Sequence, residues 1–205
     1  MILLQILDQS CLLYGCKIMP TEINIDSYYT NPLGYTRGLF AQTADSVPIT
    51  DINPTGDLLG TGVGSLTVPA DAFKIGDSFQ LTMGGHITCT NTSDLQIKIL
   101  ANGSIELANT GVLNLPQCSD QHWQLVITFT VRTLGTATVA SLVSNGTFSY
   151  IKDSSSNFEG VDFSEINATT FDTTISNTLE IITTWTSVSG GESIYSELAV
   201  LNKIF

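Results

Sequence analysis

Apolar and polar residues alternate one by one over most of the chain after about residue 38. The segment 79–89 is a good example, because its odd-numbered apolar side chains fall on one face of an extended chain: Phe79, Leu81, Met83, Ile87 and Cys89. Its polar side chains, His86 among them, fall on the other face. The pattern predicts a half-buried β-strand, and the pair Gly84-Gly85 within it predicts a bulge or a close approach of another backbone.

The segment 123–131 repeats this alternation and is the clearest predicted strand. Segments 95–99, 179–185 and 194–200 have the same period, and the last one is expected to place Ile194, Leu198 and Val200 on one side. The residues expected to pack in the core or against neighbouring subunits are Trp123, Leu125, Ile127, Phe129, Trp185, Leu198 and Val200.

Turn residues separate these segments. Asn102-Gly103 and Asn145-Gly146 each carry the signal of a two-residue hairpin. The spacing predicts an all-β domain of about nine to eleven antiparallel strands in two packed sheets. Spacing alone does not choose between a jelly roll, an immunoglobulin-like sandwich and a closed barrel. Trp123 follows both Cys89 and Cys118 instead of lying between them, which disfavours the immunoglobulin arrangement.

Residues 1–37 differ from the rest and predict an N-terminal appendage, with residues 38–205 as the main domain. Helical spacing of apolar residues near the start is compatible with a short helix that packs against other subunits. An extra strand or a disordered tail is the alternative, because an isolated helix of that length is marginally stable.

Composition narrows the possible functions. The chain is 42% hydrophobic and 13% charged, and its formal net charge is −12. Binding to nucleic acid is not expected, because the cationic side chains that neutralise phosphates are scarce. The same charge opposes binding to an anionic membrane surface. No apolar run reaches the roughly 18–20 residues that a membrane span requires, and no basic segment typical of a secretory signal precedes the apolar start. We therefore expect a soluble protein with no membrane partner.

The segment 59–69, LGTGVGSLTVP, and the following segment 70–87, ADAFKIGDSFQLTMGGHI, carry the most distinctive motifs. They resemble a pattern in structural proteins of tailed phages, giant viruses and virophages that leads into a jelly-roll head domain. Later segments fit the same pattern, so that the resemblance covers about residues 40 to 200. It implies a homotrimer laid out like tumour necrosis factor, which acts as a fibre head or capsid decoration on the virion surface. Residues 1–37 would then attach it to other capsid proteins.

Two histidines and two cysteines form the candidate metal set His86, Cys89, Cys118 and His122. His86 and Cys89 are an odd number of residues apart on one predicted strand and therefore point to opposite faces. This disfavours a metal site, and neither a metal nor a cofactor is predicted. Free thiols are expected, although a link between Cys11 and Cys16 stays possible in an oxidising setting.

Catalytic motifs are weak. The sequence has no G-x-S-x-G motif and only two histidines, so a hydrolytic triad is not expected. Asp162 and Glu165 lie in a predicted polar loop, 154–170, with a spacing that suits solvation or calcium as readily as glycosidic acid–base chemistry. The glycine-rich segment 60–64 lacks the lysine of a phosphate-binding loop. No catalytic residue is assigned.

Four aromatic residues lie in the region 150–171: Tyr150, Phe158, Phe163 and Phe171. They are expected to plug one end of the sandwich rather than to form an exposed rim that contacts sugars. The sequence thus predicts a non-enzymatic, homotrimeric virion surface protein that mediates attachment through a host glycan or receptor. A carbohydrate-binding module of a secreted system and a small β-fold hydrolase are the alternatives.

Overall fold

The computed structural model describes residues 37–153 and 157–205. All regular secondary structure within these ranges is β-strand, which confirms the predicted all-β class. The predicted appendage lies outside the described residues except for Arg37, so its form and role stay predictions.

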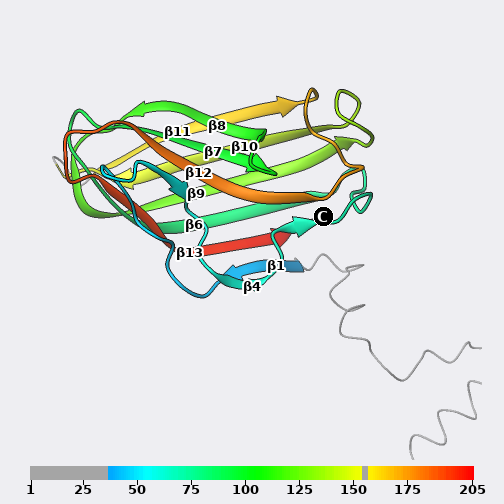
Figure 1. The fold of residues 1–205 in the computed structure, drawn as a ribbon, viewed down its shortest axis with the longest axis horizontal. Helices are drawn as coiled ribbons and strands as arrows, with labels where there is room; N and C mark the ends of the chain where they lie inside the picture. Colours follow the sequence, from blue (N-terminus) through cyan, green and yellow to red (C-terminus); the bar gives the residue numbers. More distant parts are fainter. Residues whose placement is uncertain (1–36, 154–156) are drawn as a thin grey trace, which may run out of the picture. The chain divides into compact units, whose positions relative to one another are not determined.

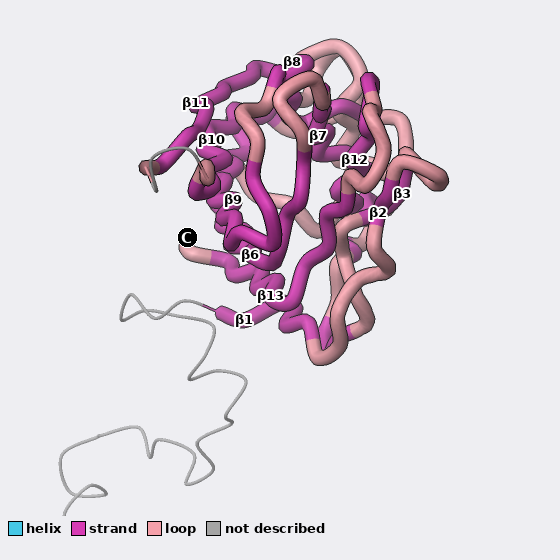
Figure 2. The backbone as a smooth tube through the Cα atoms, turned by 90° about the vertical axis from the view of Figure 1, so that its left-hand side faces the viewer, coloured by secondary structure: helices cyan, strands magenta, loops and turns pink. Residues whose placement is uncertain are grey.

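The strands form two antiparallel sheets that pack face to face (Figure 1, Figure 2). The larger sheet has the order β11-β10-β9-β6-β13-β1-β4, with β2 beside β13. Its strands are β1 (Arg37–Gln42), β2 (Ile49–Thr50), β4 (Gly62–Gly64), β6 (Ser78–Cys89), β9 (Cys118–Thr133), β10 (Ser141–Ile151), β11 (Phe158–Asn167) and β13 (Ser193–Lys203). The smaller sheet has the order β3-β12-β7-β8, with β5 also beside β12. Its strands are β3 (Thr55–Asp57), β5 (Thr67–Val68), β7 (Asp94–Ala101), β8 (Ile105–Asn114) and β12 (Asn177–Ser187).

The strand order is that of a jelly roll with an inserted hairpin. The first strand, β1, pairs with the last, β13, in the larger sheet, and β3 pairs with β12 in the smaller one. Strands β6 and β7 continue this pattern of early strands beside late ones, because β6 pairs with the other edge of β13 and β7 pairs with the other edge of β12. Such alternate pairing of early and late strands in two facing sheets is the arrangement of a jelly roll. Strands β10 and β11 are additional and extend the larger sheet beyond β9.

The core lies between the sheets and is built from the predicted alternating positions. Leu81 and Ile127 from the larger sheet and Ile97, Ile99 and Ile181 from the smaller sheet are fully buried. Five of the predicted packing residues are buried core residues: Trp123, Leu125, Ile127, Phe129 and Trp185. The even-odd pattern of β6 is likewise confirmed, since its odd-numbered residues are buried along the whole strand.

The glycine-rich segment before β6 is needed for close backbone contact. At Gly62 an added Cβ would lie 2.3 Å from the carbonyl oxygen of Ala41, and at Gly64 it would lie 2.1 Å from that of Leu39. Gly64 also has a φ of 98°, in the region that favours glycine. A larger residue at either position would push β4 off β1, so these glycines fix the edge of the larger sheet.

Of the two predicted Asn-Gly turns, the structure has one. Asn102-Gly103 does form the tight turn between β7 and β8, with φ values of 54° and 68°. Asn145 and Gly146, in contrast, lie inside β10. Gly146 is there because an added Cβ would lie 2.8 Å from the ring of Phe163 on the neighbouring strand β11. The Asn-Gly pair therefore accommodates an aromatic ring instead of making a turn.

The predicted polar loop at 154–170 is mostly strand β11, which pairs along its whole length with β10. The prediction of a loop was wrong because the segment is rich in polar residues. These residues are compatible with a strand here, since β11 is the outermost strand of its sheet and exposes alternate residues to solvent. Tyr150, Phe163 and Phe171 are buried, as expected, whereas Phe158 is 78% exposed. They do not plug one end together, because the Tyr150 hydroxyl bonds to Pro116 near the end of β6, while Phe171 lines the core where β6 begins.

The expectation that Ile194, Leu198 and Val200 share one face is wrong. A bulge in β13 shifts the register between Ser196 and Leu198. Ile194 is buried, whereas Leu198 is 49% exposed and lies with Val200 on the outer side of the sheet. One extra residue in the strand reverses the facing of every residue after it.

Candidate functional site

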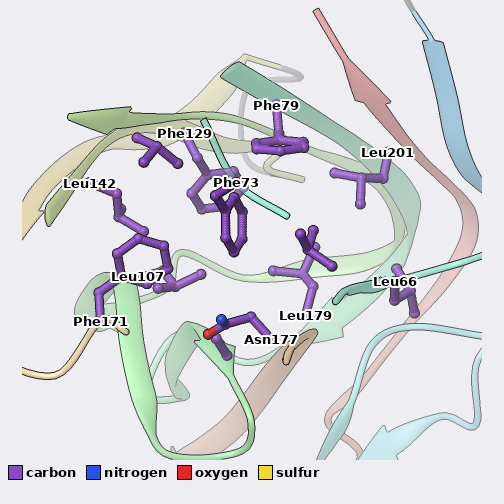
Figure 3. A pocket seen from close by; sticks show the side chains of 13 residues that line it. Leu66, Phe73, Phe79, Leu107, Phe129, Leu142, Phe171, Asn177, Leu179 and Leu201 are labelled. Carbon is purple, nitrogen blue, oxygen red and sulfur yellow. The ribbon is translucent and has the colours of Figure 1, made fainter. Parts of the chain in front are cut away.

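An apolar pocket of about 60 Å³ lies between the sheets where β6 begins and β9 ends. Its walls include Phe73, Phe79, Phe129 and Phe171, and Figure 3 shows the ring of Phe73 near the middle of this group. Apart from Asn177, every lining side chain is aliphatic or aromatic. No titratable group lines it, so the pocket offers space for packing but no group that could catalyse a reaction.

Asn177 is the polar side chain in this wall. Its Nδ2 donates to the carbonyl oxygens of Asp172 and Ile175, at 2.8 and 2.9 Å. Its Oδ1 is buried without a hydrogen-bond partner. The two donated bonds fix the bend before β12, which explains the presence of a polar residue there.

A cluster of polar and ionisable side chains lies on the outer face of the larger sheet, on the opposite side from the pocket. His86 on β6 and His122 on β9 are direct cross-strand partners, and their ring centroids are 4.3 Å apart. Tyr195 on β13 is the cross-strand partner of His86 on the other side and stacks on its ring at 5.7 Å with an interplanar angle of 7°. We call these residues, together with Glu197 and Asp120, the histidine cluster.

Two bulges bring the carboxylates to the histidines. In β13 the bulge inserts Glu197 between the paired residues Ser196 and Leu198, and Glu197 Oε2 lies 3.5 Å from His86 Nε2. In β9 a second bulge lies between Cys118 and Gln121, where Asp120 has a φ of 49°. Asp120 Oδ1 lies 2.8 Å from His86 Nδ1. Bulges commonly re-aim side chains next to functional sites, and here both aim a carboxylate at one imidazole.

Gly85 and Trp123 explain why β13 bulges at this point. An added Cβ on Gly85 would lie 2.1 Å from the carbonyl oxygen of Tyr195, so only glycine permits this approach. The indole Nε1 of Trp123 donates to the carbonyl oxygens of both His86 and Tyr195, at 3.2 and 3.1 Å. The predicted role of Gly84-Gly85 is thus confirmed, although the extra residue belongs to the neighbouring strand.

The electrostatic environment of the cluster is negative. The pKa of the Tyr195 phenol is raised by desolvation and by the charges of Glu197, Asp120 and Asp45. The lysine ion pairs of the described residues lie elsewhere, at Asp77, Glu106 and Glu159. A group that carries positive charge is therefore favoured at the cluster.

The four-residue set considered from the sequence is divided by the sheet. Cys89 and Cys118 are buried on the inner side, with their sulfur atoms 3.3 Å apart, while His86 and His122 lie on the outer side. The opposite facing of His86 and Cys89 is confirmed. The thiols are free, and because they share a hydrogen bond, the pKa of Cys89 is lowered and that of Cys118 is raised.

The other candidate residues do not assemble into a site. Asp162 points outward from β11, whereas Glu165 is half-buried, and burial together with the charge of Glu106 raises its pKa. No serine, threonine or cysteine side chain in residues 37–153 and 157–205 is hydrogen-bonded to either histidine. The geometry of a hydrolytic triad is therefore missing from the described part of the chain.

Sequence reasoning missed the pairing of the two histidines and both carboxylates. The available signal was that His86 takes an outward position on one predicted strand and that His122 directly precedes the inward-facing Trp123 of another. Their direct pairing depends on strand order, and the approach of Glu197 and Asp120 depends on bulges whose position the alternation does not show.

No known family model matches this chain, and no curated protein matches it significantly. Within the described residues, no helix is long and apolar enough to span a membrane.

Proposed function

We propose that this protein is a non-enzymatic structural protein of a virus particle surface, whose jelly-roll domain assembles as a homotrimer. In this proposal residues 1–37 attach the trimer to other capsid proteins, and the exposed surface of the trimer binds a host glycan or receptor. The viral setting and the number of subunits rest on the resemblance of segment 59–87. The self-association rests on one structural observation, an uncharged region on the outer side of the larger sheet, which we call the uncharged face.

This uncharged face covers the middle of β10, β9, β6 and β13. Its side chains are Val143, Asn145, Thr147, Gln124, Val126, Thr128, Thr130, Gln80, Thr82, Leu198, Val200 and Asn202. None of them is ionisable. Leu198 is 49% exposed, and Val126 and Val200 are half-buried.

The charge of the chain restricts the surfaces through which two copies can meet. Copies that each carry a formal net charge of −12 repel one another at most approaches. The repulsion is least where the contacting surface carries no charge. Depletion of charged residues is also typical of the centre of protein–protein interfaces. A contact through the uncharged face therefore buries aliphatic groups without desolvating ions.

The outer face of the smaller sheet has a different character. It carries Lys98, Glu106 and Glu180, and Lys98 pairs with Glu106 at 3.5 Å. Such a surface suits contact with water. The difference between the two outer faces supports assembly through the larger sheet.

Light scattering coupled to size exclusion tests the assembly directly. The purified chain of 22.0 kDa should elute as a trimer of about three times that mass. Val126→Lys places a charge at the centre of the uncharged face and should yield monomers, because each copy would have to bury an unpaired ammonium. Val112→Lys is the matched control, since Val112 is 59% exposed on the smaller sheet, and it should stay trimeric.

A monomeric parent chain would contradict the proposal, and so would a Val126→Lys variant that stays trimeric. A monomer that is retained by a polysaccharide column would favour the carbohydrate-binding module instead. Deleting residues 1–37 tests attachment: a folded trimer that no longer loads onto particles supports the assigned role of these residues, and an unfolded product contradicts it.

A further inference from the structure

We propose that His86, His122 and Glu197 form a binding site for one divalent transition-metal ion, with zinc as the preferred class, and that Asp120 orients His86 for this role. Two imidazoles and one carboxylate are a common ligand set for zinc. The site borders the uncharged face at Gln124 and Leu198 but shares no residue with it, and all three ligands come from a single chain.

The donor atoms are close enough to share an ion. One nitrogen from each histidine and one carboxylate oxygen of Glu197 all lie within 4.8 Å of one another. His86 Nε2 and Glu197 Oε2 are 3.5 Å apart. Two ligands of a tetrahedral zinc ion lie about 3.3–3.5 Å apart when each bond is about 2.0–2.2 Å long. The third ligand, on the exposed His122, needs only a small side-chain movement.

The hydrogen bond to Asp120 determines what His86 offers to the ion. A carboxylate only accepts, so a neutral His86 must donate its Nδ1 proton to Asp120 Oδ1, 2.8 Å away. Its Nε2 then carries a lone pair next to Glu197. A cation between these two acceptors, which are 3.5 Å apart, would satisfy both lone pairs at once. Metal-binding histidines characteristically donate their other ring nitrogen to a carboxylate in this way.

The backbone places the three ligand residues side by side before any ion binds. His86 lies within the central strand β6, and the strands on both of its sides contribute the other groups. Asp120 is fixed by its own backbone N–H, which donates to Thr88 Oγ1 at 3.0 Å. Ligands carried on the strands of a sheet are positioned more precisely than ligands on loops.

The competing explanation is a protonated His86 that forms ion pairs with Asp120 and Glu197. The 3.5 Å separation between Nε2 and Oε2 exceeds the usual 2.7–3.2 Å of an N–H···O hydrogen bond, which weakens this explanation. The ion pair also assigns no role to His122, whereas a metal ion uses all three groups.

Zinc titration by calorimetry tests the site in the full chain. The parent should carry Cys11→Ser and Cys16→Ser, so that thiols outside the described residues do not compete for the metal. It should bind one Zn²⁺ per chain. His122→Ala and Glu197→Gln each remove a ligand and should weaken binding by at least about 100-fold, while Asp120→Asn should weaken it by about 10–100-fold. Asp162→Asn, an exposed carboxylate elsewhere on the same outer face, should leave it unchanged.

Cobalt absorption identifies the ligands independently. Co²⁺ should give the visible bands of a nitrogen and oxygen site without the near-ultraviolet band of a thiolate ligand, because Cys89 and Cys118 are buried on the other side of the sheet. A thiolate band, no stoichiometric Zn²⁺ binding, or binding that survives both His122→Ala and Glu197→Gln would overturn the site. The monomeric Val126→Lys variant should bind Zn²⁺ like the parent, which separates this result from the test of assembly.

Discussion

The two ends of the sandwich are closed by different physical means. At the end where β6 begins, four phenylalanine rings close the core, with Phe73 edge-on to Phe79 at 6.0 Å and to Phe171 at 5.6 Å. At the end where β6 finishes, polar groups with full sets of partners close it. Trp185 Nε1 donates to the carbonyl oxygen of Ile49 at 3.0 Å, and the Tyr150 hydroxyl donates to that of Pro116 at 2.9 Å.

The polar end also contains a buried acid. Glu192 is 1% exposed, and its carboxylate accepts from Ser93 Oγ at 2.7 Å and from the backbone N–H groups of Ser189 and Gly190 at 2.8 and 2.9 Å. Burial alone would raise its pKa, but these hydrogen bonds lower it below the ordinary value. The turn from β12 to β13 is built around this carboxylate.

The difference shows what each kind of closure requires. Aromatic rings need only shape complementarity, and their imperfect fit leaves the pocket of about 60 Å³. Buried polar groups need specific partners, which fixes the strands and turns around them. The histidine cluster lies toward the polar end, where the bulges in β9 and β13 are held by such contacts. Four predictions test this comparison.

Phe171→Ala should have the largest effect. Removing a fully buried ring from the aromatic end should lower the free energy of unfolding by about 3–5 kcal/mol, because the existing pocket grows. Urea denaturation measures the loss. Phe158→Ala is the control, since this ring is 78% exposed and its removal should cost no more than about 0.5 kcal/mol. Equal losses in the two variants would contradict the assignment of Phe171 as the plug.

Oxidation should strengthen the polar end. The sulfur atoms of Cys89 and Cys118 are 3.3 Å apart, and a disulfide between them would close a loop across 29 positions of sequence. We expect mild oxidant to form this bond and to raise the free energy of unfolding by about 2–4 kcal/mol. Mass spectrometry and thermal unfolding with and without reductant measure both effects. Cys118→Ala should abolish the response, and a response that persists would assign it to another thiol pair.

Glu192→Gln should destabilise the protein by about 1–3 kcal/mol at neutral pH, because the new amide group presents donors where backbone donors already point. A carboxyl group whose pKa is lowered by folding stabilises the protein above its unfolded pKa of about 4.3, and this contribution is lost as the pH falls through the folded value. The difference between parent and variant should therefore shrink in acid. Denaturation at neutral pH and near pH 3 measures it, and a pH-independent difference would contradict the role of the charge.

Val131→Ile should have the smallest effect and the opposite sign. Val131 is buried and lines the apolar pocket, so that one added methylene can fill empty space. The expected gain is at most about 0.8 kcal/mol. Val112→Ile on the outer face of the smaller sheet is the control and should gain less, since Val112 is 59% exposed. Destabilisation by Val131→Ile would mean that the aromatic end is already tightly packed.

Much of the fold was predictable because alternation acts locally. The inward facing of Trp123, Leu125 and Ile127 follows from the period of two in an extended chain, and the structure confirms it. The facing of Leu198 was not predictable, because one inserted residue in β13 reverses the pattern. The role of Gly146 was also hidden, since it depends on Phe163 from the neighbouring strand.

By itself the sequence determined the all-β class, the core-facing residues of the long strands and the net negative charge, because these depend on residue type and on neighbours along the chain. Only the tertiary structure decided that His86 pairs with His122, that Glu197 and Asp120 reach them through bulges, and that the uncharged residues of four strands form one face. Strand order and register bring residues distant in sequence together, and they are set by the packing of the two sheets as a whole.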